Sequence, residues 1–254
     1  MSSKRTFLLT FALALFGLAG VASSASATFH LTKIREISSG TGVADSSYVE
    51  TQAYFDFQNF LSDGAMLVRC NATCSSPTTF SSFTDVANGH SQDTVLFADS
   101  GIGTGSKDFN VDLNLDAIQA GGAVCYVGDP GYSNCVSWGN FSGNSTLMAS
   151  YGTTAGAPAP ALTSGMALRR SIAADCPTML EASDDTNNSA ADFSLTTPNP
   201  RKNSVTPTET PCPGMGPTGY PPAPSGSTPT KKKKCKKHKH RSAQVSKKKC
   251  KKHK

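Results

Sequence analysis

The apolar runs of this chain are short, and that property constrains its fold more than any other. Between residue 28 and about residue 205, β-branched and aromatic runs alternate with clusters of Gly, Asn, Asp and Ser. Clusters of that composition form turns, and no long stretch has the spacing of an amphipathic helix. We therefore expect strands near residues 30–37, 48–55, 65–69, 94–98, 109–115, 123–127, 136–138 and 166–171.

The run at residues 48–55 has the clearest strand pattern. Its odd-numbered residues are Val49, Thr51, Ala53 and Phe55, and its even-numbered residues are Tyr48, Glu50, Gln52 and Tyr54. Alternation of this kind places the two sets on opposite faces of a strand. Many short strands with Gly-rich turns predict an all-β sandwich or barrel. About 180 residues suffice for one core, so we expect a single domain at 28–212, with one helical turn at 179–183.

Charge divides the chain into two unlike parts. Of its 24 Lys and Arg residues, 14 lie in residues 231–254 and two are Lys4 and Arg5, which leaves eight elsewhere. All 18 Asp and Glu residues lie within 28–230, so this part carries 8 − 18 = −10 and the tail carries +14. Such an asymmetry indicates an interaction tail attached to an acidic body.

The tail contains the octamer Lys-Lys-Lys-Cys-Lys-Lys-His-Lys twice, at 232–239 and 247–254. Lysine is a flexible point charge, and the tail has no aromatic residue for stacking on bases. We therefore expect sequence-independent binding to an anionic polymer or an anionic membrane surface. The alternatives are a solubilising tail without a partner and self-association through the acidic body. The candidate polyanion-binding residues are Lys231, Lys232, Lys233, Lys234, Lys236, Lys237, Lys239, Arg241, Lys247, Lys248, Lys249, Lys251, Lys252 and Lys254.

Two further segments flank the body. Lys4 and Arg5 precede an uncharged apolar run at 7–22, and Ala25-Ser26-Ala27 fits a cleavage site, so residues 1–27 are a predicted signal peptide. The alternative is a retained anchor, for which the run is short. Residues 213–230 are rich in Pro and Gly and are a predicted extended linker before the disordered tail at 231–254.

Export to an oxidising compartment predicts disulfides. Of the eight cysteines, Cys235 and Cys250 lie in the tail and six lie in the body. Near-neighbour pairing would join Cys70 to Cys74, Cys125 to Cys135, and Cys176 to Cys212. Six cysteines allow 15 connectivities, so this pairing is a hypothesis.

Several short motifs, in order, give the body a family likeness. Ile34-Arg35-Glu36-Ile37 is followed by Tyr48-Val49-Glu50, by Asn88-Gly89 before an apolar strand at 94–97, by a strand at 167–170 and by an exit at Pro200–Asn203. In this order the body, over roughly residues 30–205, resembles a lamin-tail domain of the secreted bacterial kind. The resemblance implies an immunoglobulin-like β-sandwich that serves in adhesion or interaction, without catalysis; fold alone does not fix function.

The residues offer little support for chemistry. The body has only two histidines, His30 and His90, and Gly131-Tyr132-Ser133-Asn134-Cys135 fails the nucleophile-elbow pattern at its last position. Residues 101–107 resemble a phosphate loop but lack its spacing, so we expect a flexible loop. We therefore predict that the protein is not an enzyme and has no cofactor.

Two groups of residues carry side chains of the types that bind metal ions. The oxygen-rich run 184–188 with Asp192 lacks the EF-hand offsets, so we expect a solvated loop there. Cys235, His238, His240, Cys250 and His253 lie among dense Lys charge with no apolar residues, which favours a disulfide or free thiols over zinc. No metal site is predicted.

The sequence predicts a secreted, non-catalytic interaction or adhesion module held at the cell surface or envelope by a polybasic tail. The alternative is an extracellular binder of polyanions, nucleic acid or anionic wall polymer, in which the β-sandwich is only a carrier.

Overall fold

A computed structural model describes residues 29–41, 45–128, 132–172 and 178–210, and the structural statements below concern these residues. They all belong to one compact unit. The predicted signal peptide (1–27), linker (213–230) and tail (231–254) lie outside the described residues.

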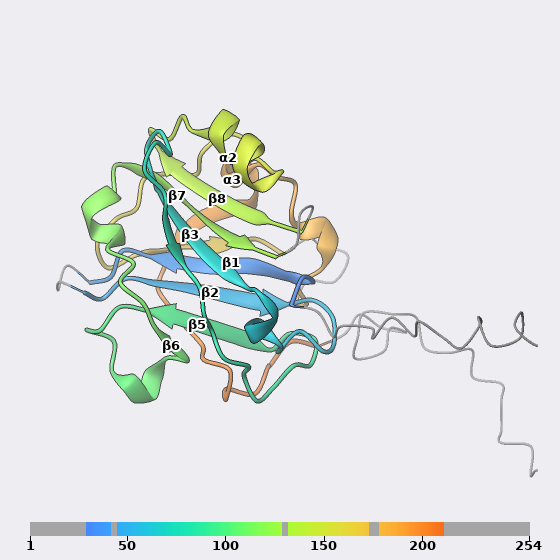
Figure 1. The fold of residues 1–254 in the computed structure, drawn as a ribbon. Coiled ribbons are helices and arrows are strands. Elements are labelled where there is room, and N and C mark those ends of the chain that lie inside the picture. The colour runs from blue at the N-terminus through green and yellow to red at the C-terminus, as the bar shows by residue number, and fades with distance from the viewer. Residues whose placement is uncertain (1–28, 42–44, 129–131, 173–177, 211–254) are drawn as a thin grey trace, which may run out of the picture. The chain divides into compact units, whose positions relative to one another are not determined.

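The described chain consists mainly of β-strands in two sheets (Figure 1). The larger sheet has the order β10-β9-β1-β2-β5-β6, and the smaller has the order β4-β3-β7-β8. Neighbouring strands are antiparallel except β5 and β6, which are parallel. The bounds in the larger sheet are β1 (Thr32–Ser38), β2 (Tyr48–Ala53), β5 (Thr94–Ala98), β6 (Phe109–Asn110), β9 (Ala167–Arg170) and β10 (Phe193–Thr196). Those in the smaller sheet are β3 (Met66–Asn71), β4 (Thr78–Phe80), β7 (Gly121–Val127) and β8 (Asn134–Gly139).

The all-β prediction is confirmed, and each of the eight predicted runs contains a strand. The prediction for 109–115 is too long, because Asn114 takes a left-handed conformation with φ of 47° and a 3₁₀ helix follows at Leu115–Ile118. The sequence pattern does not reveal β4 and β10, which have only three and four residues.

Short helices connect the strands. They are α2 (Asn144–Tyr151), α3 (Ser189–Asp192) and 3₁₀ helices at Leu61–Asp63, Thr104–Ser106, Leu115–Ile118 and Ala182–Asp184. Only Leu147 of α2 is buried, so this helix has no apolar periodicity that a sequence could display. The helical turn predicted at 179–183 forms slightly later, at Ala182–Asp184.

The two sheets share one apolar core. The larger sheet contributes Ile34, Val49, Phe97 and Leu168, and the smaller contributes Leu67, Val124, Val136 and Trp138, all fully buried. The indole Nε1 of Trp138 donates a hydrogen bond of 2.9 Å to the main-chain oxygen of Ile118, so its polar group is satisfied. Burying each large apolar side chain contributes about 1.5–3 kcal/mol, which makes this core the main source of stability.

A β-bulge at Arg35 fits the first strand to this core. Ile34 and Ile37 are both fully buried in it, although residues three apart in a regular strand face opposite sides. The register between β1 and β2 shifts between Ile34 and Glu36, which leaves Arg35 as the extra residue. Both isoleucines therefore face the core, and Arg35 and Glu36 both line a pocket on the other face of the sheet.

The outer face of the smaller sheet is apolar and is covered by α2. Val68, Ala123 and Val127 pack in a second cluster with Phe141 and Leu147. This cluster includes two disulfides, Cys70–Cys74 and Cys125–Cys135, which are the pairings expected from neighbouring cysteines. The third expected pair, Cys176 and Cys212, lies outside the described residues.

A buried arginine ties the loop before β10 to the sheets. Arg170 is 1% exposed, and its Nη1 lies 3.2 Å from a carboxylate oxygen of Asp192 and 3.3 Å from one of Asp185. Lys33 Nζ lies 2.7 Å from the other oxygen of Asp185. The expectation of a solvated loop at 184–188 is therefore wrong for Asp185, whose carboxylate is needed to balance two cations and lies only 4% exposed.

Candidate functional site

The outer face of the larger sheet is polar, and the last part of the described chain covers it. Glu36 of β1 and Glu50 of β2 are each 1% exposed and face one another across the strands. Arg169 of β9 is the cross-strand partner of Glu36 on its other side. Residues 197–210, which we call the covering segment, contact all three strands. Adjacent like charges on a sheet destabilise it, so these carboxyl groups require specific partners.

Three donors surround the Glu36 carboxylate. Tyr48 Oη and Arg169 Nε both donate hydrogen bonds to it, and the main-chain N–H of Asn199 donates to Oε1 at 2.8 Å. Burial, followed by the charge of Glu36, raises the pKa of the Tyr48 phenol, which keeps this donor protonated. Both oxygens of Glu36 are thus engaged by fixed donors.

Glu50 is held by the covering segment. The main-chain N–H of Arg201 donates to Glu50 Oε2 at 2.6 Å, and Arg201 Nε lies 3.5 Å from Oε1. Burial raises the pKa of Glu50 to about 7, an effect that Arg201 opposes and the charge of Glu36 strengthens. Glu50 therefore changes charge close to neutral pH, far above an ordinary glutamate.

A further ion pair fastens the covering segment to β2. Arg201 Nη1 lies 2.8 Å from Glu209 Oε1, and Gln52 Nε2 donates to the same oxygen at 2.7 Å. Residues 199 and 201 are thus attached near the middle of β1 and β2, and residue 209 is attached one step further along β2.

A polar pocket of about 140 Å³ lies between the sheet and the covering segment. Three guanidinium groups and three carboxyl groups line it; its wall residues are Arg35, Glu36, Glu50, Arg169, Asn199, Arg201, Thr208 and Glu209. We call this the charged pocket. Charged groups of both signs, fixed by mutual hydrogen bonds, can orient a small polar ligand without rearranging.

Arg35 differs from the other two arginines of the charged pocket. Its Nη1 donates to the main-chain oxygen of Arg170, and none of the ion pairs among the described residues includes it. Burial lowers the pKa of Arg35; Glu50 opposes this effect, and Arg169 and Arg201 add to it. Arg35 is therefore a half-buried cation close to two others.

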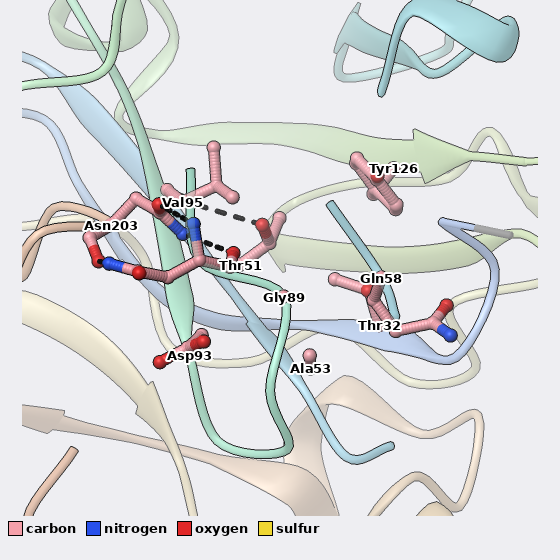
Figure 2. A pocket seen from close by; sticks show the side chains of 10 residues that line it. Thr32, Thr51, Ala53, Gln58, Gly89, Asp93, Val95, Tyr126 and Asn203 are labelled. Atoms are coloured by element: carbon pink, nitrogen blue, oxygen red, sulfur yellow. Dashed lines mark hydrogen bonds between the residues drawn. The ribbon is translucent and has the colours of Figure 1, made fainter. Parts of the chain in front are cut away.

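A smaller cavity, of about 10 Å³, lies where Asn203 meets the turn at Asn88-Gly89 (Figure 2). Asn203 Nδ2 donates to the main-chain oxygen of Asn88, and Asn88 N donates back to Asn203 Oδ1, both at 2.8 Å. The cavity has room for about one water molecule. Thr32 Oγ1 lines it and has no hydrogen-bond partner among the described residues. This cavity is too small for a ligand, and the asparagine pair serves to fix the covering segment.

A wider hollow, of about 590 Å³, lies between the edge strands β4 and β6. Phe80, Phe83 and Phe109 line it together with short polar side chains. The rings of Phe83 and Phe109 lie 5.0 Å apart at their centroids and belong to the same aromatic cluster as Phe97 of the core. This hollow holds no buried charged group and is less defined chemically than the charged pocket.

Some of the residues noted in the sequence lie in the described part of the chain, and others do not. Every candidate polyanion-binding residue, from Lys231 to Lys254, lies outside the described residues, as do the tail cysteines and histidines. His90 is exposed and lies 4.0 Å from Asp56.

In the expected flexible loop at 101–107, Lys107 is buried and its Nζ donates to the main-chain oxygen of Asp99 and to Asn110 Oδ1. This cation needs enclosed acceptors, so the loop is anchored at that end.

Two kinds of functional element are absent from the described part of the chain. No group of three or more His, Cys, Asp or Glu side chains there is arranged to hold a metal ion. None of its helices has the length and apolar character needed to cross a bilayer.

The charged pocket escapes prediction from the sequence, although five of its eight wall residues lie in motifs noted there. Glu36 and Glu50 stand at polar positions of strands, where solvent exposure is the ordinary expectation. The available signal was the spacing of Ile34 and Ile37, which in a strand indicates a bulge. Nothing in the sequence reveals that Arg201 and Glu209, more than 150 residues later, cover this face.

Comparison with known proteins yields no matching family model, no matching curated protein and no matching solved structure.

Proposed function

We propose that this protein is a secreted, non-catalytic interaction module, an immunoglobulin-like β-sandwich of the lamin-tail kind, held at the cell surface or envelope by its polybasic tail. The observation that carries this proposal is the division of charge. Residues 28–230 hold eight basic and 18 acidic residues, whereas residues 231–254 hold 14 basic residues and no acidic one. A concentrated positive segment on an acidic body is suited to polyanionic surfaces.

The attachment of the covering segment supports a tethering role. Before the described chain ends at Thr210, Asn199 and Arg201 are bonded to buried carboxyl groups and Asn203 is bonded to Asn88. Thr210 itself bonds to Thr178. A tail can hold the folded domain at a surface only if the segment that leads to the tail is attached to the domain. The contacts of the covering segment provide this attachment.

The positions of the family-like motifs support the lamin-tail part of the proposal. Residues 34–37 lie in β1, residues 48–50 in β2, residues 94–97 in β5 and residues 167–170 in β9. These four strands are neighbours in the larger sheet, in the order β9-β1-β2-β5. The Pro200–Asn203 exit ends on Asn203, which binds the Asn88-Gly89 turn. Motifs that are distant in the sequence thus meet in one sheet.

The experiment that tests this function uses two full-length variants. In the first, the 13 Lys of the tail and Arg241 become Gln; in the second, the tail sequence is shuffled at constant composition. We expect the neutral tail to move the protein from the cell-surface fraction to the medium, and the shuffled tail to leave it at the surface, because electrostatic binding does not depend on order.

The same variants separate the two functional hypotheses. If the neutral-tail variant stays at the surface, the sheets are the binding element and the tethering proposal fails. If instead the wild-type protein is released to the medium but binds DNA or a wall polymer, it acts as a polyanion binder with the sandwich as carrier. For 6–10 engaged charges, affinity for nucleic acid should fall about 10³–10⁵-fold between 50 and 200 mM salt.

A further inference from the structure

We propose that the charged pocket is a binding site for a small oxyanion group, a carboxylate or a phosphate, with Arg35 as the residue that receives it. This site is separate from the tail and does not depend on the tethering function proposed above. Three features support it: the bulge in β1, the pairing of the surrounding charges and the size of the pocket.

The bulge directs Arg35 into the pocket. In a regular strand, Arg35 and Glu36 would face opposite sides, and one of them would enter the core. Because the register shifts between Ile34 and Glu36, both Arg35 and Glu36 line the pocket. Bulges are common beside functional sites, where they reorient a side chain. The irregularity of β1 thus brings one extra cation, Arg35, to the charged pocket.

The surrounding carboxyl groups are already occupied. Glu36 is held by Arg169, Tyr48 and Asn199, and Glu209 is held by Arg201 and Gln52. The second guanidinium branch of Arg169 is also used, since Nη2 donates to Thr197 O at 3.1 Å. Glu50 accepts from Arg201 and titrates near neutral pH.

Arg35 is the cation that remains without a carboxylate partner. Glu50 and Glu209 act on Arg35 electrostatically, but both are paired with Arg201. A half-buried guanidinium without an ion pair of its own is unfavourable, because burial removes part of its hydration. An anion in the adjacent pocket would provide such a partner. A cation would find no carboxylate there free of an arginine partner, so the charges favour an anion.

The size of the pocket selects a small group. Its volume of about 140 Å³ is well above that of the one-water cavity at Asn203 and below the roughly 300–1,000 Å³ of sites that enclose drug-sized ligands. A single phosphate or carboxylate fits such a space. Of a nucleotide or a polymer chain, only one anionic group could enter the pocket, and the rest would remain outside it. The planar fork of arginine matches the oxygen spacing of both anions, which is the reason arginine predominates at such sites.

Anion binding should depend on pH through Glu50. The charged and titratable groups facing Glu50 are Arg35 and Glu36 from β1, Tyr48 from β2, Arg169 from β9, and Arg201 and Glu209 from the covering segment. Protonation of Glu50 removes a negative charge that acts on both Arg201 and Arg35. An anion of constant charge should therefore bind more tightly at pH 6 than at pH 8.

The test follows the arginine side chains of the full-length protein by NMR. Inorganic phosphate and acetate are titrated in separate arms, and the Nε–H signals of Arg35, Arg169 and Arg201 are monitored; Arg35→Gln assigns the Arg35 signal. We expect saturable shifts of these signals with one of the two anions, which identifies the preferred chemistry. Monitoring arginines separates this site from anion binding by the lysines of the tail.

Variants decide whether Arg35 receives the anion. Arg35→Gln should weaken binding by at least about tenfold, the equivalent of one charge-assisted hydrogen bond. Arg35→Lys, which keeps the charge but not the fork, should weaken it less. Lys202→Gln is the matched control, since Lys202 lies on the same segment but bonds to Gly105 outside the pocket, and should leave affinity unchanged.

Two outcomes would overturn the proposal. One is a wild-type protein whose Arg35, Arg169 and Arg201 signals do not respond to either anion at millimolar concentration. The other is equal affinity in wild type and in a folded Arg35→Gln variant. Glu50→Gln provides a second measurement if Arg35→Gln does not fold: with sulfate, whose charge is constant between pH 6 and 8, this variant should lose the pH dependence of binding, and retention of that dependence also contradicts the proposal.

Discussion

The two outer faces of this protein are both covered, but by opposite means. On the smaller sheet, apolar side chains and two disulfides pack under α2. On the larger sheet, Glu36 and Glu50 are buried under an extended segment by hydrogen bonds and ion pairs. The first arrangement depends on excluded water and covalent bonds, and the second depends on each charge finding its partner.

This difference determines what each face can do. An apolar interface tolerates exchange of one hydrophobic side chain for another and has no charge to offer a ligand. A network of buried charges is intolerant of a missing member but presents oriented donors and acceptors. The covering by residues 197–210 therefore combines a structural role with a pocket, whereas the covering by α2 is structural.

The largest effect is expected on the polar face. Glu36→Ala removes the acceptor for Arg169, Tyr48 and Asn199 together, and we expect it to lower the free energy of unfolding by about 4 kcal/mol. Glu36→Gln retains an acceptor oxygen and should lose about half as much. Chemical denaturation measures both; equal stability of wild type and Glu36→Ala would show that the network contributes nothing net.

The second effect concerns the pH dependence of stability. The folded-state pKa of Glu50 is raised to about 7 from an ordinary 4.5, so the folded protein retains this proton while the unfolded chain releases it. Stability from Glu50 is therefore present below pH 4.5 and is lost as the pH rises through 7. The change amounts to about 3 kcal/mol.

The matched measurement compares wild type with Glu50→Gln at pH 5 and pH 8. The difference between the two unfolding free energies should change by about 2.5 kcal/mol over this interval, because other titrating groups cancel in the comparison. A difference that is the same at both pH values would mean that Glu50 is not perturbed.

The third effect tests the apolar face. Leu147→Ala should destabilise the protein by about 2.5 kcal/mol, near the low end for a buried leucine, because a short surface helix can settle onto the gap. Met148→Ala is the control on the same helix, since Met148 is 51% exposed and its loss should cost less than about 0.5 kcal/mol. Similar values for the two variants would indicate that α2 does not cover the sheet.

The smallest effect is expected from the shorter disulfide. Replacing Cys70 and Cys74 by Ala opens a loop with a sequence separation of only four residues, so loop entropy gives a loss of about 2 kcal/mol. The loop of Cys125–Cys135, with a separation of ten, should be worth slightly more. Melting temperatures of the two double variants test this order, and a larger loss for the shorter loop would show that packing, not loop entropy, dominates.

The sequence predicts the fold better than the site, for identifiable reasons. Short runs between Gly-rich turns specify strands locally, and β5 appears at its predicted bounds, residues 94–98. The burial of Glu50 is not local: the alternation of β2 suits a strand with one solvated face, and only the covering segment makes that face an interior. Helix α2 cannot be predicted from the sequence for a different reason: only Leu147 of this helix is buried, so its apolar residues show no helical periodicity.

The covering segment also has a mechanical consequence. Its attachments follow one another along the chain: Thr210 to Thr178, Glu209 to Gln52, Asn203 to Asn88, Arg201 to Glu50 and Asn199 to Glu36. A pull applied at the C-terminal end would load these contacts one at a time, in that order, before it reached β10. Under force the segment would thus detach in small successive steps, and each step would release a short length of chain while the two sheets remained folded.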